Sequence, residues 1–137
     1  MKISLTAATV AALVLAAPAF AGDPAAGEKE FNKCKTCHSI IAPDGTAIVK
    51  GAKTGPNLYG VIGRTAGTYP DFKYKDSIVA LGATGFAWTE ADIAVYVQDP
   101  TAFLKDKLGD KKAKSQMAFK LAKGGEDVAA YLASVVK

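Results

Sequence analysis

Five consecutive residues, Cys34-Lys35-Thr36-Cys37-His38, constrain this chain more than any other feature. Two thiols three residues apart, followed directly by an imidazole, form the C-x-x-C-H pattern that is typical of covalent haem attachment. Thioether bonds from Cys34 and Cys37 would fix the edge of a haem. The imidazole of His38 would then lie under the iron, where a neutral ring nitrogen can bind it.

The same pattern fits a zinc half-site, a redox dithiol or a structural disulfide. Zinc needs four ligands, and the chain has no further cysteine or histidine to complete them. A thioredoxin-like dithiol would lie in a strand–helix–strand context, which the sequence does not show. A thiol oxidoreductase that uses Cys34 and Cys37 stays a rival function, which free thiols in the exported protein would support.

Residues 1–21 are predicted to be a cleaved secretory signal peptide, which leaves 22–137 as the haem domain. Lys2 is the only charged residue of the segment, and Ala19-Phe20-Ala21 matches the A-x-A cleavage pattern. An uncleaved membrane anchor is the alternative, but Pro18 and the Ala- and Thr-rich composition favour cleavage. We therefore expect export to the periplasm, where an unmodified cysteine pair would tend to form a disulfide unless haem captures it.

Cleavage would leave His38 as the only histidine and Met117 as the only methionine. A lone methionine usually fills a gap in a core. Met117, however, lies in a polar, irregular stretch far along the chain from His38, as a ligand on the opposite haem face requires. His/Met ligation raises the reduction potential and leaves the iron six-coordinate, which suits electron transfer. The alternative is a haem enzyme, such as a peroxidase or gas-binding protein with an open iron position.

The hydrophobic pattern predicts short helices and long loops, and so an all-α domain. Helices are expected from Asp23-Pro24 to about Lys33, over 71–81, from Thr89 to Pro100, from Asp99-Pro100 to Leu104, and after Gly124. Residues 39–67 are predicted to be mostly loop, in which Ile40-Ile41 and Ile48-Val49 form short extended pieces or cover an apolar surface. A loop of this length in a small domain indicates that it wraps a non-protein group.

Several other side chains can serve a haem, although each has an ordinary explanation. The carbonyl of Pro56 can accept a hydrogen bond from His38, but the surrounding sequence also fits a simple turn. Four side chains can donate hydrogen bonds to buried haem propionates: Arg64, Tyr74, Trp88 and Tyr96. The three aromatic residues could instead simply pack in the core.

Basic charge is concentrated around Met117. Residues 105–123 hold seven lysines and two acidic residues, a net charge of +5, whereas the rest of the chain after residue 21 carries −2. A solvated surface is the ordinary explanation, but a basic ring around a haem edge would steer the protein to an acidic partner. Nucleic acid does not suit an exported haem protein. The lysines are Lys105, Lys107, Lys111, Lys112, Lys114, Lys120 and Lys123.

Taken together, these stretches resemble the class I cytochromes c, and in particular the cytochromes c2 of purple photosynthetic bacteria. The resemblance covers 22–137. It is carried by residues 27–38, Gly55-Pro56-Asn57-Leu58-Tyr59-Gly60, Gly63-Arg64, Trp88, Tyr96, Met117-Ala118-Phe119 and Tyr131-Leu132. The loops 40–54 and 103–115 are longer than in the mitochondrial relatives, which leaves their course open.

The resemblance implies a class I cytochrome c fold around one covalent haem c, with no catalytic residues. It implies thioethers at Cys34 and Cys37, and His38 and Met117 as axial ligands. It assigns the remaining haem-site roles as follows: the Pro56 carbonyl as acceptor for His38, Tyr74 and Trp88 as propionate partners with Arg64 nearby, Tyr96 near the methionine sulfur, and Gly27 and Tyr131 at the crossing of the first and last helices.

The resemblance also implies partners. A monomer would carry single electrons from a membrane cytochrome bc complex to the photosynthetic reaction centre, or to a terminal oxidase. It would dock through lysines around the exposed haem edge and would not be embedded in the membrane.

Overall fold

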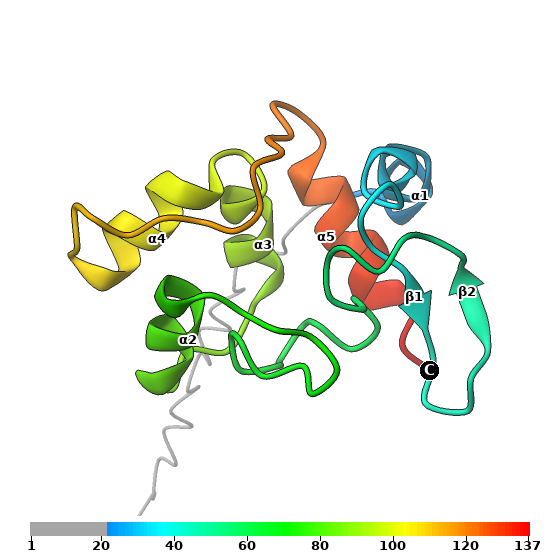
Figure 1. The fold of residues 1–137 in the computed structure, drawn as a ribbon. Helices are drawn as coiled ribbons and strands as arrows, with labels where there is room; N and C mark the ends of the chain where they lie inside the picture. The colour runs from blue at the N-terminus through cyan, green and yellow to red at the C-terminus, as the bar shows by residue number, and fades with distance from the viewer. Residues whose placement is uncertain (1–21) are drawn as a thin grey trace, which may run out of the picture.

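The computed structural model describes residues 22–137, which fold into short helices joined by long loops (Figure 1). The elements are α1 (Pro24–Glu30), the 3-10 helix η1 (Phe31–Lys33), β1 (Ile40–Ile41), β2 (Ala47–Val49), α2 (Asp76–Ala83), α3 (Glu90–Tyr96), α4 (Pro100–Leu108) and α5 (Gly125–Ser134). The predicted signal peptide lies outside the described residues. Within 22–137, no helix has the length and apolar character needed to cross a bilayer.

Three helices begin where side-chain caps are predicted from the sequence. Asp23, Thr89 and Asp99 each accept a hydrogen bond, at 2.9–3.1 Å, from a backbone N–H two or three residues further on. Pro24 and Pro100 follow two of these caps at the start of the helix, where a missing N–H costs nothing. The predicted starts of α1, α3 and α4 are therefore confirmed.

Helix α1 crosses α5, which brings the two ends of the described chain together (Figure 1). Gly27 is buried at the crossing, and a Cβ there would overlap the carbonyl oxygen of Asp127 and lie 2.8 Å from Cβ of Tyr131. The rings of Phe31 and Tyr131 pack 5.7 Å apart on the same interface. The predicted close crossing at Gly27 and Tyr131 is confirmed, because only glycine lets the helices approach this closely.

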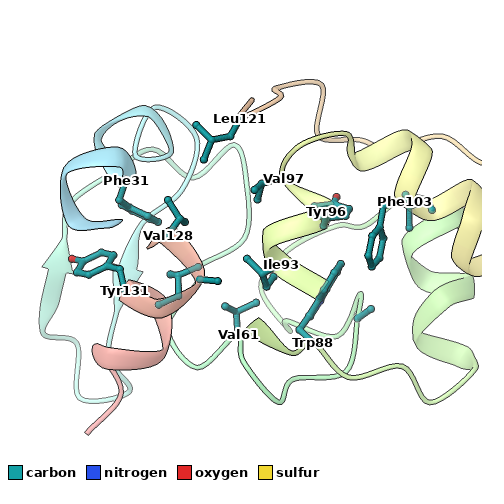
Figure 2. Close-up of a cluster of buried hydrophobic side chains, with 14 of the residues drawn as sticks. Phe31, Val61, Trp88, Ile93, Tyr96, Val97, Phe103, Leu121, Val128 and Tyr131 are labelled. Carbon is teal, nitrogen blue, oxygen red and sulfur yellow. The ribbon is translucent and has the colours of Figure 1, made fainter. Parts of the chain in front are cut away.

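The buried side chains form one continuous cluster, and Figure 2 shows two groups within it on either side of Val61, Ile93 and Val97. One group lies between α1 and α5. The other stacks Trp88 on Phe103, with ring centroids 5.7 Å apart, and sets Tyr96 edge-on to both. Helix α3 contacts both α4 and α5, so it links the two groups.

The two expected extended pieces form a small antiparallel hairpin, in which Ile40 pairs with Val49. Three predicted boundaries were wrong. Helix α3 ends at Tyr96 rather than continuing to Pro100. Helix α2 begins at Asp76 rather than at residue 71, because the backbone at Lys75 is still extended. Helix α4 continues past Leu104 to Leu108 and ends where Gly109 turns left-handed at φ 62°. Its last turn therefore occupies part of the predicted 103–115 loop.

Candidate functional site

A cavity of about 750 Å³ is lined by members of both groups of buried side chains, among them Trp88 and Val128. Its walls are mostly apolar, and its size is typical of small-molecule and cofactor pockets. Cys34, Cys37, His38 and Met117 all line it. A hollow of similar volume, about 780 Å³, lies between α1 and residues 119–124, but none of these four residues reaches it. The cavity is therefore the candidate site.

Continuous turns carry the C-x-x-C-H segment from η1 to the cavity wall. The N–H of Cys34 donates to Phe31 O at 2.8 Å, and the N–H groups of Cys37 and His38 donate to Cys34 O at 3.0 and 2.9 Å. These bonds extend the helical path, so both thiols and the imidazole stand on a fixed backbone. The first helix delivers the motif to the cavity, as expected from the sequence.

The imidazole of His38 is fixed through its Nδ1 atom. Nδ1 lies 2.8 Å from the carbonyl oxygen of Pro56, and it must be the donor because a carbonyl can only accept. Burial lowers the pKa of His38, and the bond to Pro56 opposes this only in part. The ring is therefore neutral near pH 7, with the lone pair on Nε2, as an iron ligand requires.

Glycines let the backbone close tightly around the imidazole. A Cβ at Gly55 would overlap the His38 ring, and a Cβ at Gly51 would overlap the His38 carbonyl oxygen. The Gly55 N–H donates to Cys37 O at 2.8 Å, and the Ala52 N–H donates to Lys35 O at 3.0 Å. The histidine side of the cavity is thus enclosed by backbone contacts.

The Cys34 thiol does not have the character of a reactive redox cysteine. Burial, reinforced by the nearby Glu30 carboxylate, raises the pKa of Cys34 to about 11. Reactive cysteines instead have lowered pKa values that maintain the thiolate. Among the described residues, no three His, Cys, Asp or Glu side chains come together to hold a metal ion. Both observations weigh against the dithiol and zinc interpretations.

Met117 faces the same cavity from the long segment between α4 and α5. Its N–H donates to Ser115 Oγ at 3.0 Å, and the same Oγ lies 3.2 Å from the hydroxyl of Tyr96. The Ser115 N–H donates to Thr101 Oγ1 at 3.1 Å, and the Lys114 N–H donates to Ser77 Oγ, also at 3.1 Å. Tyr96 is therefore linked to the backbone of Met117 through Ser115.

Trp88, Arg64 and Tyr74 also line the cavity, as the resemblance implies for propionate partners. Trp88 is only 6% exposed. The guanidinium of Arg64 is partly occupied: it donates to the carbonyl oxygens of Asn57, at 2.9 Å, and of Tyr59. Burial lowers the pKa of Arg64 and raises that of Tyr74, so the Tyr74 hydroxyl stays neutral near pH 7.

The charged residues of the cavity wall are all basic: Lys33, Arg64, Lys75 and Lys114. Of the seven lysines in the predicted basic cluster, only Lys114 lines the cavity, although all seven are exposed. Lys107 pairs with Asp92 at 3.3 Å, and Lys120 pairs with Asp99 at 2.7 Å. Proximity to Met117 along the chain therefore identifies only one of the four cations that line the cavity.

Sequence reasoning missed Lys33 and Lys75 at the cavity, and it missed two polar anchors. Lys33 directly precedes the first cysteine, so its position carried a usable signal. Asn57 holds β1 by accepting from the N–H of Ile41 at 3.0 Å and donating to its carbonyl at 2.8 Å. Asn57 and Ser115 each also accept from a backbone N–H two residues further on, that of Tyr59 and that of Met117. Their contacts with Ile41 and Thr101, however, span 16 and 14 residues and could not be read from the local sequence.

The donor set fits a c-type haem. Two thiols, one neutral imidazole and one thioether stand on the walls of a single largely apolar cavity, and basic side chains are available for the propionates. The cavity therefore suits a haem both in the kinds of donor atom on its walls and in its volume.

The comparisons with known proteins agree with this fit. The chain is 90% identical to a cytochrome c2 of Rhodobacter capsulatus over 137 residues, the full length of both chains. It is 59% identical to cytochrome c-551 of Roseobacter denitrificans over 132 residues, which cover 95% of this chain and 94% of the relative. No family model matches the chain.

Solved structures give the same answer for the fold. The structure of cytochrome c2 from Rhodobacter capsulatus matches with a TM-score of 0.84 and 88% identity, over 85% of this chain and all of that one. The structure of cytochrome c2 from Paracoccus denitrificans matches with a TM-score of 0.81 and 52% identity, over 83% and 96% of the two chains. Such proteins hold one covalent haem c and are electron carriers rather than enzymes. The chain accordingly belongs to the class I cytochrome c family, in its cytochrome c2 group.

Proposed function

We propose that this chain works in the periplasm as a single-electron carrier between a cytochrome bc complex and a photosynthetic reaction centre or a terminal oxidase. The observation that carries the proposal is the shared cavity of Cys34, Cys37, His38 and Met117. Bound at these residues, haem c supplies a one-electron Fe(III)/Fe(II) couple. The two cysteines would hold it covalently, with His38 and Met117 as the axial ligands.

The chain's own residues give the site its electron-transfer character. Pro56 orients the imidazole of His38 and maintains the tautomer that leaves Nε2 free to bind. Ser115 holds the backbone of Met117 in position at the cavity wall. With His38 and Met117 both bound to the iron, no position would be left for oxygen or peroxide, which favours the carrier over the enzyme alternative.

Charge at the cavity supports docking to an acidic partner. Lys33, Lys75 and Lys114 line the cavity together with Arg64, and no acidic side chain does so among the described residues. The Lys33 ammonium is paired with Glu30 at 2.6 Å, so Lys75 and Lys114 contribute most. Cations on one face speed the approach of an oppositely charged partner, and salt screens this effect. We therefore assign the docking surface to these lysines, with the exposed lysines of 105–123 contributing at longer range.

The test is the rate at which the reduced protein reduces a photo-oxidised reaction centre, measured at low and high salt. We expect Lys75→Gln combined with Lys114→Gln to slow the second-order rate about tenfold at low salt and far less at high salt. Lys50→Gln is the matched control, because Lys50 is exposed and does not line the cavity. Equal slowing by the control, or a rate indifferent to salt, would contradict the proposed docking face.

The proposed export rests on residues 1–21. The solved Rhodobacter capsulatus structure is covered completely by 85% of this chain, the share that residues 22–137 would make up. Cleavage after Ala21 predicts that the N-terminal sequence of the exported protein starts at Gly22. Recovery of holoprotein that begins at residue 1 would instead support a retained anchor.

A further inference from the structure

We propose that Gln116 is a positioning residue, a two-point clamp that holds the Met117 segment closed over the cavity and slows dissociation of the methionine. The inference rests on the proposed role of Met117 as an axial ligand. It concerns the neighbour of that ligand, whose side chain reaches another part of the fold.

The geometry of the clamp uses both ends of one amide. Gln116 Oε1 accepts from the backbone N–H of Lys75 at 3.1 Å, and Gln116 Nε2 donates to the carbonyl oxygen of Lys73 at 3.3 Å. The two bonds lie on either side of Tyr74. An amide group has one acceptor and one donor end, so this arrangement satisfies both ends against a single extended segment.

The clamp lies at the cavity itself. Gln116, Met117, Tyr74 and Lys75 all line it, so the two bonds join the wall that carries the methionine to the wall that leads into α2. Opening this side of the cavity would require the two segments to separate. The bonds join residues 41 and 43 positions apart, so the chain itself does not hold the segments together.

The segment that carries Met117 depends on such side-chain bonds. Among residues 22–137, no backbone–backbone hydrogen bond joins 114–118 to another element. The other attachments are made by side chains, at Ser77, Thr101 and Tyr96. Gln116 is the side chain of the segment that reaches a distant backbone at two points, and its loss should therefore make opening measurably easier.

The size of the effect follows from the exposure of the clamp. Both bonds are solvent-exposed, and a net intramolecular hydrogen bond shifts an equilibrium by a factor of about 2 to 10. We expect removal of both bonds to speed opening about tenfold. The global stability of the protein should change much less, since the core contacts of α1, α3 and α5 are not involved.

The experiment uses oxidised holoprotein and added imidazole as the probe. At saturating imidazole, the rate at which the far-red sulfur-to-iron band disappears reports how fast the methionine side opens. Gln116→Leu keeps the bulk without the amide and should exchange about ten times faster than the wild type. Gln116→Glu keeps the acceptor for Lys75 but loses the donor to Lys73, and it should fall between the two.

Gln98→Leu is the control, because Gln98 is also an exposed glutamine and does not line the cavity. A Gln116→Leu protein that exchanges at the wild-type rate would overturn the clamp, and so would equal acceleration by Gln98→Leu. A wild-type protein without the sulfur-to-iron band would overturn the ligand role of Met117 and the clamp with it. The two failures are therefore distinguishable.

Discussion

The two sides of the cavity are built in different ways. On the histidine side, backbone bonds and glycines enclose His38 so closely that a single added carbon at Gly51 or Gly55 would overlap it. On the methionine side, residues 114–118 are attached through the side chains of Ser77, Tyr96, Thr101, Ser115 and Gln116. Backbone enclosure resists opening, whereas a few side-chain bonds permit it. We therefore expect the methionine side to be the first part of the site to yield.

The largest expected effect is on the histidine side. In Gly51→Ala, the new methyl group would overlap the His38 carbonyl oxygen and lie 2.7 Å from the Lys35 carbonyl oxygen. Because both neighbours are backbone, the fold must shift, and we expect the free energy of unfolding to fall by about 3 kcal/mol in urea titrations of the holoprotein.

Gly45→Ala is the matched control in the same hairpin region. Gly45 has a φ of 87° and open space around it, so alanine there meets only the cost of a left-handed backbone, about 1 kcal/mol. Equal losses at the two glycines would show that the backbone enclosure of His38 is not tight.

A smaller effect is expected on the methionine side. Ser115→Ala removes the acceptor for the Met117 N–H and the partner of the Tyr96 hydroxyl, which is largely buried. We expect a loss of about 1–2 kcal/mol in the free energy of unfolding. The sulfur-to-iron band should also be lost at a lower urea concentration than the main unfolding transition.

Ser134→Ala is the comparison for this variant, because the Ser134 hydroxyl donates only within α5, to Tyr131 O at 2.7 Å. In the Ser134→Ala protein, the sulfur-to-iron band and the folded structure should be lost at the same urea concentration. If the Ser115→Ala protein also lost both in a single step, the methionine side would not be the weaker one.

The smallest expected effect concerns the outer end of the methionine segment. The Lys120 ammonium, with the Ala102 N–H, holds the pKa of the exposed Asp99 carboxyl below its ordinary value. A lowered folded-state pKa stabilises the protein above the unfolded pKa of about 4, and this contribution is lost as the pH falls through the folded value. Asp99→Asn retains a cap acceptor but loses the charge.

The difference in stability between wild type and Asp99→Asn should therefore be present at pH 7 and shrink below about pH 4. Urea titrations at pH 7 and pH 3 would measure it. A difference that stays constant across this range would mean that the contribution of Asp99 is its cap alone and that the ion pair adds nothing.

Sequence-based prediction succeeds best for features that depend on residues close together in the chain. The C-x-x-C-H motif and the caps at Asp23, Thr89 and Asp99 act within a few residues, so the haem-binding segment and three helix starts could be placed from sequence. The late start of α2 could not, because the Lys75 N–H is held by Gln116, 41 residues away. The end of α4 was marked by Gly109, a signal that the sequence analysis overlooked.

The basic surface shows the same limit. Residues 105–123 are the richest in lysine along the chain, yet Lys33 and Lys75 line the cavity instead of most of them. Lys107, Lys120 and Lys33 itself are engaged with carboxylates. The fold decides which charges face the opening, and linear clustering does not report it.

The most direct test of the central claim compares oxidised wild-type and Met117→Ala holoprotein by optical spectroscopy, together with their reduction potentials. If Cys34, Cys37 and His38 form a rigid side that holds the haem and Met117 is the ligand on the yielding side, the variant will retain covalent haem. It will also lose the far-red sulfur-to-iron band and have a lower potential. A variant that keeps the band, or that carries no covalent haem, would contradict the account.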